Sequence, residues 1–304
     1  MSGQYLSTTA NNLRKFITVV FILAVLGIGL TVLISLYSKP SETPSIEPTE
    51  DLGDLVAKYE VIGRSVEGRP IESFTYGNGE EHLVFIGGIH GGYEWNSVIL
   101  AYQFMDYLVA NPAIVPDNLT VTVIPSLNPD GVYRVTKKEG RFTSDDVSTN
   151  KEILASGRFN AHEVDLNRNF DCDWKPTSKW RERIVSAGLK PFSEPEALAL
   201  RNFVLENKPD AVIFWHSQAN AVYASECKNG ILPETLEIMN AYSRGSGYPR
   251  VESFDSYETS GDAEGWLASI NIPSITVELK THEVIEWEKN LAGIKALFRY
   301  YLTK

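Results

Sequence analysis

Short apolar runs alternate with segments of helical period along most of the chain. The apolar runs have the length and β-branched content of buried strands, and they occupy residues 81–90, 119–131 (where the strand runs into a turn), 210–217 and 273–279. Helical periodicity marks residues 94–110, 193–207 and a closing amphipathic segment from Val284 to Tyr301. Strands that alternate with helices predict an α/β fold, with a mixed, mostly parallel sheet covered by helices on both faces.

Two of the predicted helices carry local start or stop signals. The helix at 94–110 is expected to end before Asn111-Pro112, because a residue that precedes proline avoids the helical conformation. The helix at 193–207 begins with Ser193 as a candidate cap, Pro195 near the first turn and two early glutamates. These signals support the boundaries that the apolar period suggests.

A long uncharged segment lies near the N-terminus. Residues 16–37 contain no charged side chain, and at ~1.5 Å per residue a helix of this length crosses a ~30 Å hydrocarbon layer. A buried core helix would show a polar face, and none is visible. A cleaved signal peptide usually has an apolar stretch of only ~7–15 residues followed by a small-residue cleavage site, and this segment is not followed by one. We therefore expect an uncleaved transmembrane anchor.

Positive charges next to this segment predict its orientation. Arg14 and Lys15 precede it and only Lys39 follows closely, which favours a cytoplasmic N-terminus and an extracytoplasmic remainder. Residues 38–54 are rich in proline and acid, as in an extended linker. The predicted order is a cytoplasmic tail (1–15), a transmembrane anchor (16–37), a flexible linker (38–54) and one catalytic domain (55–304), in a single-pass protein of the cell membrane.

Composition excludes several classes of protein. The chain has 304 residues, enough for one domain with a sizeable core. Its net charge of −11 argues against a nucleic-acid partner, because such a protein needs a basic surface to meet phosphate. Two cysteines are too few for a disulfide scaffold or for a zinc site built from four cysteines.

Polar residues collect where the predicted strands end. Of the five histidines in the chain, His90 and His216 follow or finish apolar runs, and Glu278 lies in the run at 273–279. The turn at 128–131 follows another run. In open α/β sheets, functional sites form at the carboxyl ends of the strands, so these residues are expected to meet.

Two histidines and one glutamate, with a fourth position open to water, form the ligand set of a catalytic zinc. His90, Glu94 and His216 are the candidates for one Zn²⁺ ion, although a histidine or glutamate taken singly is more often a surface or core residue. Such a zinc activates water and polarises a carbonyl group. Glu278, in an apolar setting, is suited to take the proton of the water, unless its strand lies at an edge and the side chain faces solvent.

The chain resembles the zinc carboxypeptidases of the carboxypeptidase A-like family from about residue 59 to 283. The resemblance rests on the order of several short motifs, each weak alone. They are IGRSVEGRPI (62–71), GGIHGGYEWNS (87–97), NPDG (128–131), VDLNRNFD (164–171), FSEPEALAL (192–200), WHSQ (215–218) and YETSGDAEGWLASINIPSITVEL (257–279). The use of two histidines and one glutamate by carboxypeptidase A is itself an established example of a catalytic zinc site.

The resemblance implies a role for each matching residue. It implies zinc ligands at His90, Glu94 and His216, a general base at Glu278, and an oxyanion-stabilising cation at Arg158. Asn167 and Arg168 would hold the terminal carboxylate of the substrate, unless they form only a capped loop with a surface ion pair, and Tyr257 would cap the substrate. Asp165 would accept a hydrogen bond from the far nitrogen of His90 and fix its tautomer.

One departure from the family pattern concerns the first two ligands. The family usually places two residues between the first histidine and the glutamate, whereas in this chain Gly91, Gly92 and Tyr93 intervene. The extra residue falls in a Gly-Gly turn, where the backbone has wide freedom. We expect Glu94 still to reach the metal.

Two further predictions concern the rim of the site. Cys172 and Cys227 both follow strand-end motifs in a domain expected to face an oxidising compartment, which favours a disulfide over two unpaired buried thiols. Glu264 matches the family's side-chain pocket, where an acid would select a basic terminal residue; the alternative is that Glu264 faces solvent or pairs internally.

The predicted function is a membrane-anchored zinc metallocarboxypeptidase, a hydrolase that removes the C-terminal residue of peptides, with a preference for a basic one. Its partners would be a peptide with a free terminal carboxylate and the lipid bilayer around residues 16–37. Two alternatives stay open from the sequence. The same zinc site serves an amidase acting on cell-wall peptides or N-acyl amino acids, and an inactive surface binding module would keep the fold without the chemistry.

Overall fold

The computed structural model describes residues 58–254, 257 and 259–304. The predicted tail, anchor and linker lie outside these residues. Within the described part of the chain, no helix is both long and apolar enough to cross a membrane.

The fold is built on an eight-stranded sheet. Its strand order is β1-β2-β4-β3-β7-β12-β8-β11. The strands are β1 (Lys58–Arg64), β2 (Pro70–Gly77), β3 (Glu81–Ile86), β4 (Leu119–Ile124), β7 (Ala211–Ser217), β8 (Ala221–Ala224), β11 (Arg250–Val251) and β12 (Ser274–Leu279). The central strands β4, β3, β7 and β12 run parallel, as do β8 and β11, while β1–β2, β2–β4 and β8–β12 are antiparallel. The predicted mixed, mostly parallel sheet is confirmed.

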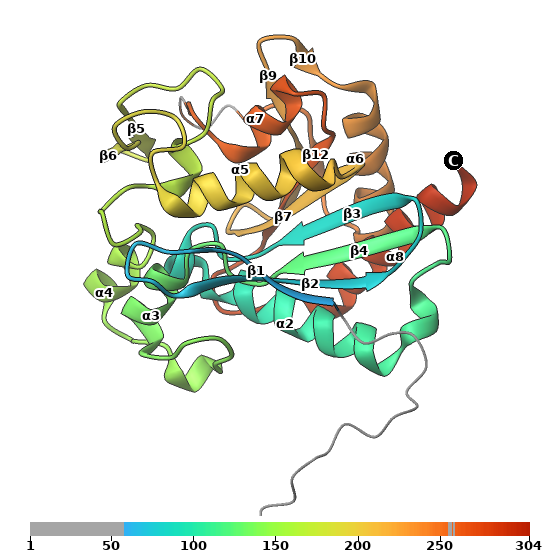
Figure 1. Ribbon diagram of the computed structural model, residues 1–304, viewed down its shortest axis with the longest axis horizontal. Helices are drawn as coiled ribbons and strands as arrows, with labels where there is room; N and C mark the ends of the chain where they lie inside the picture. The colour runs from blue at the N-terminus through green and yellow to red at the C-terminus, as the bar shows by residue number, and fades with distance from the viewer. Residues whose placement is uncertain (1–57, 255–256, 258) are drawn as a thin grey trace, which may run out of the picture. The chain divides into compact units, whose positions relative to one another are not determined.

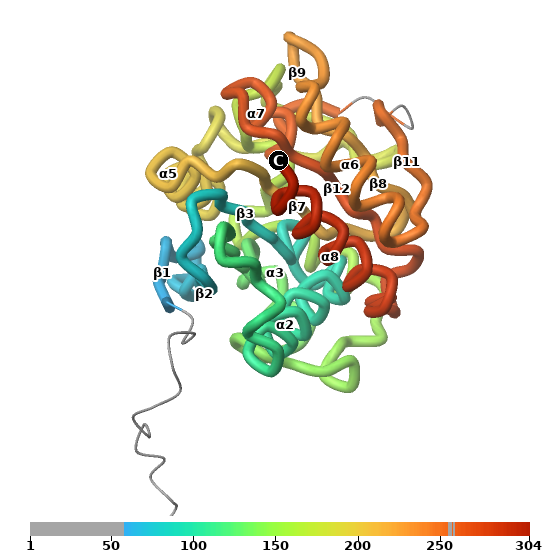
Figure 2. Tube along the Cα trace, turned by 90° about the vertical axis from the view of Figure 1, so that its right-hand side faces the viewer, coloured from blue at the N-terminus to red at the C-terminus, as the bar shows by residue number. Residues whose placement is uncertain are grey.

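Helices lie on both faces of this sheet, as predicted. They are α2 (Trp95–Ala110), α3 (Pro129–Thr136), α4 (Lys151–Ser156), α5 (Pro195–Asn207), α6 (Pro233–Ser246), α7 (Ala263–Ser269) and α8 (Trp287–Thr303), with single-turn 3₁₀ helices η1 (Gly91–Glu94), η2 (Pro112–Ile114), η3 (Ser144–Asp146) and η4 (Leu166–Arg168). In Figure 1, α5 and α2 lie on opposite sides of β3 and β4. Helices α6 and α8 run side by side (Figure 2).

The apolar runs are continuous because the sheet is buried on both sides. In β3, Leu83 and Phe85 join the core under α2, α6 and α8, whereas Val84 and Ile86 join the core under α5 and α7. Alternate side chains of a strand point to opposite faces, so a strand covered on both faces needs an apolar residue at every position. The central strands of the sheet are therefore fixed in register by two separate cores.

Two small hairpins complete the described structure. One joins β5 (Thr177–Trp180) to β6 (Arg183–Ser186), and the other joins β9 (Glu226–Cys227) to β10 (Gly230–Ile231). Neither hairpin belongs to the main sheet. Both carry residues to the pocket described below.

Two local expectations need correction. Glu194 rather than Ser193 is the N-cap of α5, and the Ser193 hydroxyl donates to the carboxylate of Glu194 (2.8 Å). The expected turn at 128–131 is the start of α3, because the Asn128 side chain accepts the N–H of Gly131 (2.9 Å) and Pro129 opens the helix. In both cases the proline marks the first helical turn correctly.

Candidate active site and metal centre

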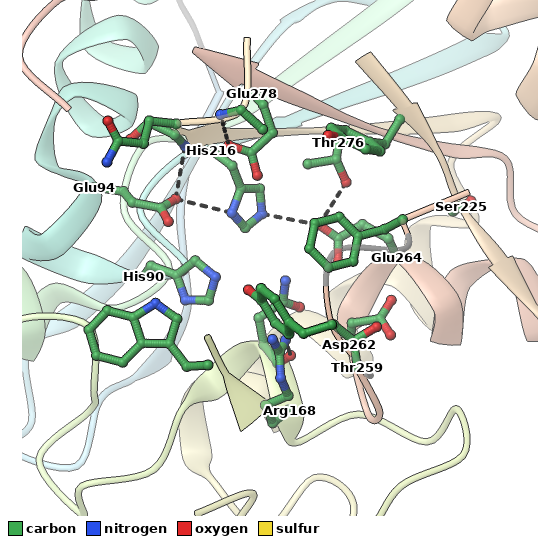
Figure 3. Close-up of a pocket in the computed structure, with 18 of the residues that line it drawn as sticks. His90, Glu94, Arg168, His216, Ser225, Thr259, Asp262, Glu264, Thr276 and Glu278 are labelled. Carbon is green, nitrogen blue, oxygen red and sulfur yellow. Dashed lines mark hydrogen bonds and ion pairs between the residues drawn. The ribbon is translucent and has the colours of Figure 1, made fainter. Parts of the chain in front are cut away.

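Three predicted ligands meet at the carboxyl edge of the sheet. His90 precedes η1 after β3, Glu94 is the last residue of η1, and His216 lies near the end of β7. One ligand atom from each of the three comes within 4.8 Å of the others, and all three side chains are buried. Figure 3 shows them turned toward one space.

The extra residue between His90 and Glu94 is taken up by η1. Gly91 has a φ of +47°, in the left-handed region that favours glycine. A Cβ atom at this position would lie 2.5 Å from the carbonyl oxygen of Gly157. The tight turn brings Glu94 back beside His90, as expected from the Gly-Gly sequence.

His216 lies between two carboxylates. Its Nδ1 is 3.1 Å from Oε2 of Glu94, and its Nε2 is 3.1 Å from Oε1 of Glu264. Burial alone would lower the pKa of His216, but the charges and hydrogen bonds of the two glutamates outweigh it and raise this pKa well above its ordinary value of 6.5. The backbone N–H of Ser217 also donates to Oε2 of Glu94 (3.2 Å), which fixes that carboxylate.

His90 has a different environment. Its Nδ1 lies 3.4 Å from Oδ1 of Asp165, within ion-pair distance but without the predicted hydrogen bond, and Asp165 accepts a 2.8 Å hydrogen bond from Nε of Arg158. Burial and the Arg158 charge lower the pKa of His90 to about 4. The guanidinium of Arg158 lies 4.9 Å from the ring centre of Trp180 and 3.7 Å from Oε1 of Glu94. Arg158 is therefore held at the edge of the ligand cluster.

Glu278 lies on β12 opposite His216 on β7. It lines the pocket and accepts the backbone N–H of Ala219 (3.2 Å), so its strand is internal and not an edge. Burial, followed by the nearby charge of Glu94, raises the pKa of Glu278 to about 7. A carboxylate with such a pKa is suited to exchange a proton near neutral pH.

Asn167 and Arg168 are buried pocket residues, not members of a surface ion pair. Oδ1 of Asn167 accepts the N–H of Ala263 (2.8 Å) at the start of α7. Nε and Nη2 of Arg168 donate to the carbonyl of Lys179 (3.3 and 3.1 Å). Both side chains line the same pocket as the metal-ligand candidates.

Glu264 lines the pocket and also pairs internally. Only 5% of the residue is exposed, so the alternative that it faces solvent is wrong, whereas the alternative that it pairs internally is confirmed by its contacts with His216 and Thr276. Burial raises the pKa of Glu264, but its hydrogen bond and attraction to His216 outweigh this effect and lower it. Its neighbour Asp262 caps α7 by accepting the N–H of Gly265 (2.6 Å), and burial together with Glu264 raises the pKa of Asp262 to about 6.

Tyr257 and the two cysteines lie around the rim. Tyr257 lines the pocket and packs edge-on against Phe254, with 4.9 Å between the ring centres. Cys172 and Cys227 are joined by a disulfide with a Cα–Cα distance of 6.1 Å. The bond ties the segment after η4 to β9.

The pocket has a volume of about 320 Å³ and includes residues that the sequence patterns did not identify. They are Tyr93, Trp180, Arg181, Tyr223, Phe254, Asp262 and Thr276. Trp180 and Arg181 come from the β5–β6 hairpin, whose short strands carry no long apolar run. No signal in the sequence alone could have placed them at the site.

The residues present fit a zinc ion. Two imidazoles and one carboxylate, buried and mutually close, match the protein ligands of a catalytic zinc and leave one coordination position open. Carboxylates lie beside the second nitrogen of each imidazole, at Asp165 and Glu264. Such partners commonly orient metal-binding histidines.

Sequence comparison identifies the family. Residues 49–291 match the Peptidase M14 family, described as zinc carboxypeptidase. The chain belongs to this family of zinc-dependent peptidases. The resemblance of its motifs to the family is thereby confirmed.

Relatives with different activities match this chain. It is 26% identical over 241 residues to γ-D-glutamyl-L-diamino acid endopeptidase 1 of Lysinibacillus sphaericus, covering 72% of this chain and 59% of that protein. It is 25% identical over 266 residues to murein peptide amidase A of Escherichia coli, covering 84% of this chain and 95% of that one. The structure of thrombin-activatable fibrinolysis inhibitor shares the fold, with a TM-score of 0.67, 20% identity and coverage of 83% and 70%.

Proposed function

We propose that this protein is a zinc-dependent carboxypeptidase that hydrolyses the last peptide bond of a substrate with a free terminal carboxylate and a positively charged terminal side chain. One observation carries the proposal: the groups that would bind the metal, transfer the proton and hold negative charge all lie in one pocket. The metal-ligand cluster, the raised-pKa carboxylate of Glu278 and the guanidiniums of Arg158 and Arg168 all line it.

His90, Glu94 and His216 would hold the zinc, which supplies a Lewis acid for water and for the scissile carbonyl. Glu278 would take the proton from the attacking water and then donate it to the leaving amine. Arg158 would donate hydrogen bonds to the oxygen of the scissile carbonyl as it gains negative charge. Asp165 keeps this guanidinium oriented in the resting protein through its 2.8 Å hydrogen bond.

Arg168 would restrict the reaction to chain ends. It is buried, and among the described residues its hydrogen bonds go to the backbone carbonyls of Lys179 and Asn167 and not to a carboxylate. A buried guanidinium without a counter-ion carries a desolvation penalty of several kcal/mol. The free carboxylate of a terminal residue relieves this penalty, with Asn167 as a second contact, whereas an internal peptide bond does not.

Glu264 would favour a positive terminal side chain. A buried carboxylate at the pocket wall attracts a cation and repels an acidic side chain. Asp262 and Glu226 line the same pocket and add negative character to it. Tyr257 would close over the bound residue from the rim.

The test uses a set of matched peptides and one variant. Peptides ending in Lys, Phe or Glu, each with a free or an amidated terminus, are incubated with the purified protein with and without a metal chelator. We expect cleavage of free-terminus Lys peptides, loss with chelator, and a rate roughly 10²-fold lower for Glu278→Gln, because the general base is gone. Equal rates for the free and the amidated peptides would contradict the exopeptidase proposal.

A second candidate is hydrolysis of cell-wall peptides, which the two bacterial relatives favour. A diamino acid at the end of such a peptide offers a free carboxylate for Arg168 and an amine for Glu264. The competing substrate is therefore a γ-D-glutamyl-diaminopimelate peptide, assayed beside an α-linked peptide ending in Lys. Whichever of the two has the higher kcat/KM identifies the activity.

We also propose a membrane anchor at residues 16–37, with the catalytic domain outside the cytoplasm. The proposal is supported by the uncharged length of this segment and its flanking positive residues. Protease added to intact cells should release a fragment that begins within residues 38–54. A domain that stays protected until lysis would reverse the orientation.

A further inference from the structure

Glu264 directs one of its oxygens to a metal-ligand candidate. It is the second residue of α7, and its Oε1 lies 3.1 Å from Nε2 of His216. The hydroxyl of Thr276 donates to the same oxygen from β12 (3.2 Å). Figure 3 shows His216 between Glu94 and Glu264, with both contacts drawn.

Each nitrogen of His216 faces a carboxylate oxygen, and a carboxylate accepts hydrogen bonds, so Glu264 favours hydrogen on Nε2. Only one of the two carboxylates, Glu94, is itself a metal-ligand candidate. In a neutral imidazole with hydrogen on Nε2, the lone pair is on Nδ1. That atom lies 3.1 Å from Oε2 of Glu94, on the side of the ligand cluster.

We propose that Glu264 is a positioning residue for His216: its contact with Nε2 holds the rotation of the imidazole so that Nδ1 faces the metal-ligand cluster. The inference rests on the proposed metal centre and gives Glu264 a role besides substrate selection. A residue that only attracted a substrate cation would not need its carboxylate oxygen shared between a metal ligand and a threonine.

The proposal also explains the position of Glu264 in the fold. α7 begins immediately after the cap at Asp262, and the carboxylate is buried against the carboxyl ends of β7 and β12. Asp165 lies 3.4 Å from Nδ1 of His90, a longer contact without a hydrogen bond. Each histidine of the cluster thus has its own carboxylate partner, contributed by a different segment of the chain.

The experiment measures zinc affinity by competition with a chromogenic chelator. The proteins are the wild type, Glu264→Gln, Glu264→Leu and Glu226→Gln. Glu226 lines the same pocket, and no hydrogen bond or ion pair joins it to the described ligand candidates, so its variant controls for the loss of one negative charge. Loss of a carboxylate that orients a metal-binding histidine typically weakens metal binding about 10–100-fold.

We expect zinc affinity to fall roughly 10-fold for Glu264→Gln, which keeps an acceptor oxygen, and roughly 100-fold for Glu264→Leu, which has none. Glu226→Gln should stay within a few-fold of wild type. Equal zinc affinity for wild type and both Glu264 variants would overturn the proposal. Equal weakening in all three variants would also overturn it, because net charge alone would then account for the effect.

The outcome is separable from the fate of the proposed function. A wild-type protein that binds no zinc contradicts the function itself. A wild-type protein that binds zinc and hydrolyses peptides, while the Glu264 variants change only the preference between Lys and Phe peptides, leaves the function intact and removes the positioning role. ¹⁵N NMR of the histidine rings adds a direct reading, with Nε2–H of His216 expected in the zinc-bound wild type.

Discussion

His90 and His216 lie in one cluster but in opposite electrostatic environments. His216 is held inside β7 between Glu94 and Glu264, and its pKa is raised. His90 lies outside the strands, and burial together with Arg158 lowers its pKa to about 4. The difference arises because two carboxylates, those of Glu94 and Glu264, lie 3.1 Å from the nitrogens of His216. His90 has one carboxylate at 3.4 Å, and that carboxylate, Asp165, also pairs with Arg158.

The comparison shows that a carboxylate partner need not make a histidine more basic. Asp165 can orient His90 while its charge is neutralised by Arg158, so the imidazole stays neutral and ready to bind a metal. Glu94 and Glu264 together favour the protonated form of His216 when no metal is present. We therefore expect zinc binding to release a proton from His216 but not from His90.

Substitution of each histidine in turn is expected to give the largest effect, because the two substitutions should lower the unfolding free energy by different amounts. In the zinc-free protein at pH 6, His216→Ala leaves the buried Glu264 without its cation and Glu94 with only the 3.7 Å contact to Arg158, so it should cost about 3 kcal/mol or more of unfolding free energy. His90→Ala leaves Asp165 paired with Arg158 and should cost less.

The sign of its pH dependence follows from the raised pKa of His216. Its stabilising effect is complete below the unfolded pKa of about 6.5 and is lost as pH rises through the higher folded pKa. Urea unfolding of both variants at pH 6 and pH 9 measures this. A similar cost for the two substitutions at pH 6 would show that the two environments are equivalent.

Glu278 lies opposite His216 in the sheet and allows a second test of the electrostatics of this part of the site. Its folded pKa of about 7 lies above its ordinary value of 4.5, so its contribution to stability is present below pH 4.5 and lost as pH rises through 7. At pH 8 the zinc-free Glu278→Gln protein should be more stable than wild type by roughly 2 kcal/mol, and the gain should vanish near pH 4.5. Thermal unfolding across this range checks it. A gain that does not depend on pH would show that the charge of the half-buried Glu278 is not its cause.

The smallest expected effect concerns Thr276. Thr276→Val removes one hydrogen bond to Oε1 of Glu264, while the contact between Glu264 and His216 remains. We therefore expect a loss of about 1 kcal/mol in the free energy of unfolding. Zinc affinity should change only a few-fold. A loss of zinc affinity as large as that of Glu264→Leu would instead assign the positioning of His216 to the threonine.

Much of the fold and the ligand cluster could be predicted from the sequence. Apolar runs indicated the central strands because a sheet buried on both faces demands them. Because sites form at strand ends, His216 and Glu278 were expected to lie close together. The register of β7 and β12 places these two residues side by side. The Gly-Gly turn correctly suggested that Glu94 could lie beside His90 despite the extra residue.

The partners around the cluster could not be predicted in the same way. The contact between Glu264 and His216 depends on where α7 begins relative to β7, and no local pattern encodes that distance. Trp180 and Arg181 reach the pocket on a hairpin whose strands are half exposed and only four residues each. Sequence patterns report which residues are buried in regular elements, but not how irregular segments meet.

Titration of the zinc-depleted protein with Zn²⁺ tests the central claim most directly. Bound zinc and hydrolysis of a peptide ending in Lys are measured in the same samples. We predict that hydrolysis is absent without metal, rises in proportion to bound zinc and saturates at one ion per chain. Hydrolysis that proceeds at full rate without bound metal, or a fully loaded protein that cleaves no substrate with a free terminal carboxylate, would contradict the claim.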